Sequence, residues 1–548
     1  MLEHLKNLLE KFKGKRIAFL GLGRTNLPLI HLFFKYKKKY NLDILALDNL
    51  KTKGNREVKK ICDLGIEVRL GDKCLEKLDM DVIFRSPGVY FFSKDLNEAR
   101  KKNIKITSEI EEFFYIRPCK IIAITGSDGK TTTTTIISKI LKNFGFKVHL
   151  GGNIGNPLLD KIESIERDDI AVIELSSFQL ISMKSSPDIA VFTNISPNHL
   201  DVHKNMNEYI EAKKNILIHQ KKGSLSVLDI ETDLEYNLSD CCKGKVLYFG
   251  LYNPSKKDDR TNELNSDFEK AVSLDDLNKS TKYEFLDIIN SFKKNNEDIF
   301  KKSLDNLKKE EVDELFTKII NKKSNFSLNK KFSNIKGAVN FLGSIYFLKN
   351  GKPKFIIKSE DIKLKGEHNI RNCLAAICAT YDLVSLEAIV KTLREFSGVE
   401  HRMEVICTKN GITYINDSIA TTPTRTIKGA LSFFREKIIL IAGGYDKNIP
   451  FKDLAKKIIE KVKVLVLMGE TAKKISTEVE SLLLEKNTKN NLKIFFAENM
   501  EEAVKKAKEK ATVGDKIVLS PACASFGLYK NFEERGNHFK KIVNLKDR

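Results

Sequence analysis

The 548-residue sequence predicts an α/β protein of three domains: a Rossmann-like N-terminal domain, a central P-loop-type ATPase domain with a mostly parallel sheet, and a C-terminal Rossmann-like α/β domain. Three observations lead to this prediction. Apolar strands alternate with helical segments, glycine loops follow several strands, and the length suits three or four domains of roughly 150 residues. We expect boundaries at 1–117, 118–405 and 406–548, with a lysine-rich insertion at about 252–330.

The first domain opens with an amphipathic helix in the first 16 residues and continues as strand, helix and strand. Its first strand runs into Gly21-x-Gly23, and the second strand ends at the acidic residue Asp48, as in half of a Rossmann domain. Asn26 stands where the third glycine of GxGxxG belongs, which weakens an NAD-binding interpretation. A further strand ends at Ser86-Pro87-Gly88, a loop suited to ligand contact.

The second domain begins with the most informative stretch of the chain. The apolar strand 121–124 enters the loop Gly126-Ser127-Asp128-Gly129-Lys130, and a threonine-rich helix that contains Thr131 and Thr132 follows. Backbone N–H groups of such a loop, together with a helix N-terminus, bind phosphate. Lys130 is placed to reach the outer phosphates, and the Thr131 hydroxyl to bind Mg²⁺. The loop is shorter than GxxxxGK[ST], whose first glycine would fall at Ile124.

Two further strands of this domain end in polar residues, where α/β proteins form their sites. Glu174 lies at the end of strand 168–175, at a position suited to a nucleotide-bound Mg²⁺. The strand at 187–195 leads to a polar cluster that contains His199. Lys213 follows in a helix, and judged alone it is a solvent-exposed lysine.

The insertion is polar and charged, and we expect a surface addition, with a partner site as the alternative. If it is a surface addition, its deletion (roughly 256–328) leaves catalysis intact. A hairpin with Asn350-Gly351 at its turn follows it. From about 406 the strand–helix pattern restarts with five strands, which begin near 411, 437, 462, 492 and 515.

Composition excludes several classes of protein. The net charge is +22, but the lysines are spread along the chain without interleaved aromatic residues, so we expect no nucleic-acid partner. The nine cysteines form no CxxC pair, which predicts reduced thiols rather than a zinc site. There is no apolar run of about 18 residues and no signal-peptide pattern, so we expect a cytoplasmic protein with no membrane span.

Several motifs together resemble the Mur ligases, the ATP-dependent amide-forming enzymes of peptidoglycan precursor synthesis. They are TGSDGKTT, GGNIGNP, ELSSFQL, NHLDVH, GEHNIRN and HRMEVI, in that order. Three C-terminal motifs, NDSIATTP, GGYDKN and SPACASFGLYKNFEERG, are similar to those of members that add D-glutamate to UDP-N-acetylmuramoyl-L-alanine. The motifs span about 17–540 and leave the insertion uncovered.

The resemblance implies a reaction and its cofactors. ATP phosphorylates the substrate carboxylate to an acyl phosphate, D-glutamate attacks, and a tetrahedral intermediate expels phosphate. ATP, two Mg²⁺ ions and an N6-carboxylysine at Lys213 are implied, with UDP-N-acetylmuramoyl-L-alanine and D-glutamate as partners. A monomer acting in cell-wall synthesis, and so in cell shape and division, is also implied.

The resemblance also assigns residues, some of which their surroundings alone would not suggest. Lys130, Glu174, His199 and Lys213 match catalytic positions, and Thr131, Glu174, His199 and carbamylated Lys213 would hold metal. The ATP site would comprise Gly126, Ser127, Asp128, Gly129, Lys130, Thr131, Thr132, Asn369, Arg402 and Asp417. The UDP-substrate would contact Thr25, Asp48, Ser86, Asn153, Ser177 and Gln179, and D-glutamate would contact Thr421, Lys447, Ser525 and Phe532.

Two departures and three alternatives stay open. Ile419 stands where some members have lysine, and Gly527 replaces a common acidic residue. A sister Mur or folylpolyglutamate-type ligase with another amino-acid substrate is the main alternative. A basic nucleic-acid binder and an NAD dehydrogenase are weaker ones.

Overall fold

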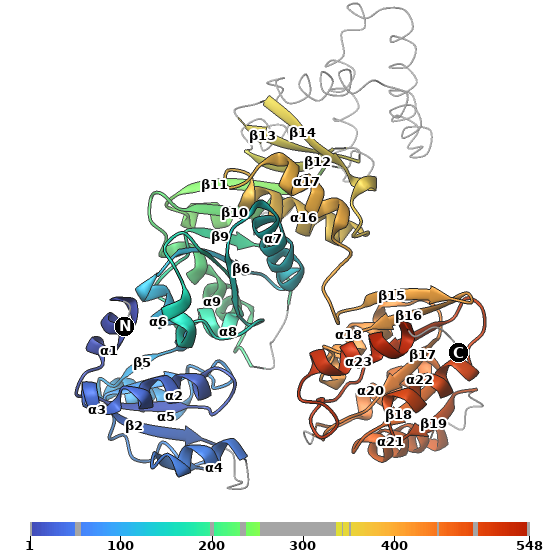
Figure 1. The fold of residues 1–548 in the computed structure, drawn as a ribbon, viewed down its shortest axis with the longest axis horizontal. Helices are drawn as coiled ribbons and strands as arrows, with labels where there is room; N and C mark the ends of the chain where they lie inside the picture. Colours follow the sequence, from blue (N-terminus) through green and yellow to red (C-terminus); the bar gives the residue numbers. More distant parts are fainter. Residues whose placement is uncertain are drawn as a thin grey trace, which may run out of the picture. The chain divides into compact units, whose positions relative to one another are not determined.

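The computed structural model describes residues 3–49, 56–197, 202–230, 237–252, 336–341, 343–349, 352–446, 449–485 and 491–544 (Figure 1). The chain divides into two compact units, Met1–Phe396 and Ser397–Arg548. Two sheets lie in the first unit and one in the second. The predicted α/β class with mostly parallel sheets is therefore confirmed. The boundaries at 117 and 405 stay predictions, and most of the predicted insertion lies outside the described residues.

The first sheet has the strand order β3-β2-β1-β4-β5, and all its pairs are parallel. Its strands are β1 (Arg16–Leu20), β2 (Asp43–Asp48), β3 (Glu67–Leu70), β4 (Val82–Arg85) and β5 (Lys105–Thr107). The helices are α1 (Glu3–Lys11), α2 (Asn26–Lys35), α3 (Lys37–Tyr40), α4 (Arg56–Asp63), α5 (Lys94–Lys101) and α6 (Glu109–Ile116). The predicted Rossmann half and the amphipathic first helix are confirmed.

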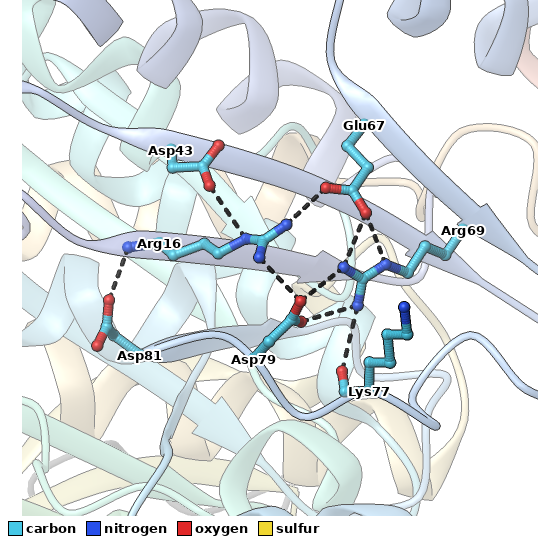
Figure 2. Close-up of polar contacts among 7 residues, drawn as sticks. All are labelled: Arg16, Asp43, Glu67, Arg69, Lys77, Asp79 and Asp81. Atoms are coloured by element: carbon cyan, nitrogen blue, oxygen red, sulfur yellow. Dashed lines mark hydrogen bonds and ion pairs between the residues drawn. The ribbon is translucent and has the colours of Figure 1, made fainter.

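An ion-pair network crosses the amino-terminal edge of this sheet (Figure 2). The Arg16 guanidinium pairs with Asp43 at 3.0 Å and Asp79 at 2.8 Å, and it also pairs with Glu67. Arg69 makes two hydrogen bonds to Asp79, at 2.8 and 2.9 Å. Ligands of parallel sheets bind at the opposite, carboxyl edge. The network therefore stabilises the sheet rather than forming a ligand site.

The second sheet has nine strands in the order β14-β13-β12-β11-β10-β9-β6-β8-β7. β12 pairs antiparallel with β13, and β13 pairs antiparallel with β14, whereas the other neighbouring strands are parallel. The antiparallel pair of β13 and β14 confirms the predicted hairpin, whose turn lies outside the described residues. The strands are β6 (Lys120–Thr125), β7 (Val148–Gly152), β8 (Ile170–Glu174), β9 (Ile189–Phe192), β10 (Leu225–Asp229), β11 (Lys245–Tyr252), β12 (Gly337–Phe341), β13 (Ser344–Lys349) and β14 (Lys352–Lys358).

Helices α7 and α16 lie side by side along this sheet (Figure 1). The helices of the central region are α7 (Lys130–Phe144), α8 (Ser177–Leu180), α9 (Met206–Ile218), α16 (Glu367–Thr380) and α17 (Leu386–Glu395). Because α7 begins at the predicted phosphate loop, the contact with α16 brings residues of GEHNIRN close to that loop.

The second unit contains a six-stranded sheet in the order β15-β16-β20-β17-β18-β19. The five predicted strands are confirmed, and an antiparallel edge strand, β15, precedes them. The strands are β15 (Glu404–Lys409), β16 (Ile412–Asn416), β17 (Ile438–Ala442), β18 (Val462–Met468), β19 (Lys493–Ala497) and β20 (Lys516–Leu519). The helices are α18 (Pro423–Lys428), α19 (Ala430–Phe433), α20 (Lys452–Lys461), α21 (Ala472–Glu485), α22 (Met500–Glu509) and α23 (Phe532–Asn544).

Two observations bear on the helices and the cysteines. Within the described ranges, no helix is long and apolar enough to cross a membrane. The cysteines are free thiols, and Cys74, Cys119, Cys373, Cys378 and Cys523 are buried as core residues.

Candidate active site

The loop between β6 and α7 requires glycine at two positions. Gly126 has a φ of +146°, and a Cβ there would lie 1.9 Å from Thr193 Oγ1. Gly129 has a φ of +78°, and a Cβ there would lie 2.2 Å from Asn372 Oδ1. Both the left-handed backbone and the close neighbours exclude a side chain. The loop therefore has the tight turn that the phosphate-binding interpretation needs, with Lys130 as the first residue of α7.

Residues after β9 hold this loop in place, and sequence reasoning did not single them out. The Asp128 N–H donates to Asn194 Oδ1 at 2.9 Å, and the Ser127 N–H donates to the Asn194 carbonyl at 2.9 Å. The Ser127 hydroxyl donates to the Ser196 carbonyl at 2.8 Å and lies 2.9 Å from the Tyr209 hydroxyl. The polar residues that follow β9 in the sequence could have indicated this role, but the sequence predicted only that they lie at the end of a strand.

Two lysines meet at the same carbonyl of this loop. Lys130 Nζ donates to the Gly126 and Ser127 carbonyls at 2.8 and 2.7 Å. Lys213 Nζ also donates to the Gly126 carbonyl, at 2.8 Å, and to Thr125 Oγ1 at 3.3 Å. The Lys213 residue is 1 % exposed, so its interpretation as a surface lysine is wrong. Burial, and then the nearby Lys130 charge, hold the pKa of Lys213 well below its usual range.

Glu174 ends β8, next to β6 in the sheet, and is buried. Its Oε1 accepts a hydrogen bond from Asn153 Nδ2 at 2.7 Å. Its Oε2 is buried and has no hydrogen-bond partner in the described part of the chain. A buried carboxylate oxygen without a donor is suited to a cation.

Helix α16 brings the predicted ATP residue Asn369 to the loop through Asn372. Thr133 Oγ1 donates to Asn372 Oδ1 at 3.3 Å, and Asn372 Nδ2 donates to Asn369 Oδ1 at 3.3 Å. Asn372 was missed, although it lies in the GEHNIRN motif. In the first turn of α7, Thr131 is buried and Thr132 is half-buried.

In the first domain, the predicted residues lie at the carboxyl edge of the sheet. Thr25 follows β1, Asp48 ends β2, and Ser86 follows β4. Asp48 Oδ2 accepts the Leu22 N–H at 2.6 Å and so holds the glycine loop. A Cβ at Gly21 would lie 2.7 Å from Ser86 Cβ, so these two loops touch. The structure thus brings Asp48 and Ser86 to the glycine loop, which ends just before Thr25.

Asn26 explains why the third glycine is missing. Its Nδ2 is within 3.0–3.1 Å of the carbonyls of Leu20, Gly21 and Phe84 and donates to them. The side chain therefore ties the glycine loop to two neighbouring strands, which a glycine at this position would not do.

Two arginines that the sequence did not single out join the first sheet to the central region. Arg24 Nη2 donates to the Asn153 carbonyl at 3.2 Å, and Arg85 Nη2 donates to the Phe178 carbonyl at 2.8 Å. Asn153, a predicted UDP-substrate residue, is thereby brought to the glycine loop of the first domain. It also touches Glu174, so it lies between the two sites.

Ser177 and Gln179 make contacts within the protein. Ser177 Oγ lies 2.9 Å from His203 Nε2, and Gln179 Oε1 accepts bonds from Ser176 in a capping box of α8. Their predicted contacts with the UDP-substrate stay predictions. His199 lies outside the described residues.

In the second unit, Asp417 follows β16 and is 4 % exposed. Its Oδ2 accepts the Ser520 hydroxyl at 2.7 Å, and its Oδ1 accepts the Met403 N–H at 3.3 Å. Burial raises the pKa of Asp417 to about 6. Arg402, the neighbour of Met403 in sequence, is exposed.

Thr421 lines a small pocket of this unit. The pocket is lined by Thr421, Pro423, Tyr445, Ile449, Phe451, Ala522, Cys523 and Ala524. Ser525 follows this wall and is buried, whereas Phe532 is half-buried at the start of α23. Lys447 lies outside the described residues. Gly527 has a φ of +87°, a backbone conformation that explains glycine in place of an acidic residue.

Known families match both units. The Mur ligase middle domain matches residues 124–286, and the Mur ligase glutamate ligase domain matches residues 401–523. A UDP-N-acetylmuramoylalanine–D-glutamate ligase from Clostridium acetobutylicum is 40% identical over 97% of both chains. One from Acetivibrio thermocellus is 40% identical over 98% of both.

A solved structure of a UDP-N-acetylmuramate-alanine ligase from Thermotoga maritima covers 96% of this chain and 99% of its own, at 18% identity and a TM-score of 0.44. A TM-score this low adds no argument to the sequence relatives. Because two ligases of this family are 40% identical over nearly the whole chain, the chain belongs to the Mur ligase family.

Proposed function

We propose that this protein is an ATP-dependent ligase that joins D-glutamate to UDP-N-acetylmuramoyl-L-alanine in peptidoglycan precursor synthesis. Relatives that bear this activity in their names are 40% identical over nearly the whole chain. The observation that carries the proposal is the meeting of Lys130, Lys213 and Glu174 around one glycine loop. A phosphate bound at this loop would pair with Lys130 at the N-terminus of α7.

The chain's residues account for the first chemical step. The loop N–H groups and the N-terminus of α7 bind the ATP phosphates. Lys130 Nζ leaves the two loop carbonyls and contacts the phosphates, which lowers the repulsion between the γ-phosphate and the attacking carboxylate. Phosphorylation converts the substrate carboxylate into an acyl phosphate, because phosphate is a far better leaving group than oxide. The D-glutamate amine then attacks, and the tetrahedral intermediate expels phosphate.

The residues fit a divalent cation. The unpartnered Glu174 Oε2 and the Thr131 hydroxyl, with His199 and a carbamylated Lys213, would hold Mg²⁺. Bound Mg²⁺ would neutralise charge on the phosphates and the acyl phosphate. Among the described side chains, no group of three His, Cys, Asp or Glu could hold a metal. The carbamate would therefore add an oxygen ligand beside Glu174 and Thr131.

Lys213 also fits carbamylation. Burial lowers the pKa of Lys213 and so favours the neutral amine, which is the form that attacks CO₂. The new N–C bond gives a carbamate anion, and the amine loses one proton to solvent. The change replaces a second cation beside Lys130 with an anion, which relieves the repulsion that burial intensifies.

The remaining assignments follow the same pattern. We propose that Thr25, Asp48, Ser86 and Asn153 contact the UDP-substrate, with Ser177 and Gln179 behind them. Asn369, Arg402 and Asp417 would contact ATP, and Thr421, Lys447, Ser525 and Phe532 would contact D-glutamate. We also propose a monomer that acts in the cytoplasm and serves cell division.

One experiment tests this function. Phosphate release from ATP should require both UDP-N-acetylmuramoyl-L-alanine and D-glutamate, and it should disappear in Lys130→Ala. Activity with meso-diaminopimelate or D-alanyl-D-alanine, and none with D-glutamate, would refute the proposal in favour of a sister ligase.

A further inference from the structure

Arg535, in the first turn of α23, is buried, and its hydrogen bonds go to neutral acceptors. The residue is 2 % exposed, and no aspartate or glutamate in the described ranges forms an ion pair with it. Its donors reach neutral acceptors: Nε to Ser418 Oγ at 3.0 Å, Nη2 to the Ser418 carbonyl at 2.9 Å, and Nη1 to the Cys523 carbonyl at 3.1 Å. Burial lowers the pKa of Arg535 to about 10, so it stays charged at neutral pH.

A buried charge without a counterion is costly, because the protein interior screens it poorly. The three hydrogen bonds satisfy three of the five guanidinium N–H groups, and their neutral acceptors leave the charge uncompensated. A neutral donor such as glutamine would avoid the cost of the charge, although it offers two N–H groups instead of five. The position of the charge therefore needs a functional explanation.

The charge lies directly behind the wall of the Thr421 pocket. Cys523, whose carbonyl accepts from Arg535, is one of the residues that line the pocket. A Cβ at Gly444 would lie 3.4 Å from Arg535 Nη1, and the next residue, Tyr445, lines the pocket as well. One layer of backbone thus separates the guanidinium from the pocket.

That wall is also strained. Ala522 has a φ of +60° and is 1 % exposed. A left-handed alanine costs roughly 1–2 kcal/mol, and such strain persists where the surroundings enforce it. Arg535 bonds the next carbonyl, and the Tyr445 N–H bonds the Ala524 carbonyl at 2.9 Å. These contacts fix the wall in its strained conformation.

We propose that Arg535 is a positioning and specificity-determining residue of this pocket: it holds the 522–524 wall and supplies the positive charge that favours an amino acid with a second carboxylate. The arginine does not touch the ligand. It acts through the backbone and through its field, which is strong in a low-dielectric site. The incoming dicarboxylate becomes the missing counterion. This inference rests on the proposed function, because it takes D-glutamate as the ligand.

The test compares full-length Arg535→Met, Arg535→Lys and the matched control Arg435→Met, which removes an exposed arginine of the same unit. Steady-state assays give the KM of D-glutamate, of ATP and of the UDP-substrate. The inhibition constant of glutarate, a dicarboxylate without the amine, reports the charge effect separately.

We expect Arg535→Met to raise the D-glutamate KM and the glutarate inhibition constant about tenfold or more, with the other two KM values within about twofold. Arg535→Lys should keep the D-glutamate KM and the glutarate inhibition constant within about threefold of the wild type. Arg435→Met should match the wild type in every constant. Equal increases in all three KM values, or an unchanged glutarate constant, would overturn the inference. If Arg535→Met fails to fold, a tenfold loss of glutarate binding in a folded Arg535→Lys overturns the role of charge. Wild-type protein that does not use D-glutamate refutes the proposed function instead.

Discussion

The buried carboxyl of Asp417 makes the stability of the C-terminal unit depend on pH in an unusual direction. Its pKa is about 6 in the folded protein, against 3.8 for the free side chain. Below about pH 4 it is protonated in both states, and there is no cost. As the pH rises through 6, the folded protein must bury a carboxylate. Stability is therefore lost between about pH 4 and 6 and stays lower above that range.

The size of this loss follows from the shift. Two pKa units at about 1.4 kcal/mol each correspond to roughly 3 kcal/mol. Asp417→Asn removes the titration but also one hydrogen-bond acceptor, worth about 1 kcal/mol. At about pH 7.5 we expect the variant to be more stable than the wild type by roughly 1–2 kcal/mol. At about pH 4 we expect it to be equal or less stable.

Hydrogen exchange measured in increasing urea can follow this unit within the full-length protein. Peptides from β16 and β20 report its unfolding, and the difference between variant and wild type cancels the titration of all other groups. The reasoning is refuted if that difference does not change between about pH 4 and 7.5. A rise in the ATP KM of the variant would separately support the proposed ribose contact.

Three other changes have defined outcomes. Gly129→Ala should abolish ATP binding measured by calorimetry, because its Cβ clashes at a φ of +78°, whereas Gly145→Ala, also at positive φ but with open space around it, should bind ATP normally. Lys213→Ala should lower turnover about a hundredfold or more and be partly rescued by formate or acetate; full activity would exclude the carbamate. Asp79 has a pKa lowered to about 2, chiefly by its hydrogen bonds from Arg69. Asp79→Asn should therefore destabilise the first domain above about pH 4, by under about 1 kcal/mol for this partly exposed pair, and the difference in urea midpoints should vanish near pH 2.

The sequence predicted what local patterns determine. Strand–loop–helix spacing and two glycines identified the loop at 126–130, and parallel strands placed Glu174 beside it. The edge strand β15 was missed, because its residues are half-buried or exposed and give no clear apolar alternation. Contacts over long sequence separations were also missed. Asn372 lies 243 positions after Gly129, and no local pattern indicates that their atoms touch.

Lys213 shows why such a site exceeds what sequence alone can predict. A lysine in a helix is usually exposed, and only the fold reveals that this one shares the Gly126 carbonyl with Lys130. With Lys213 neutral, Lys130 faces the two acidic side chains of Asp128 and Glu174. With Lys213 carbamylated, the group gains one more negative charge, and among the described residues Glu174 Oε2 has no donor. In the proposed site, carbamylation would thus strengthen the binding of a cation, so CO₂ and Mg²⁺ should bind with positive coupling.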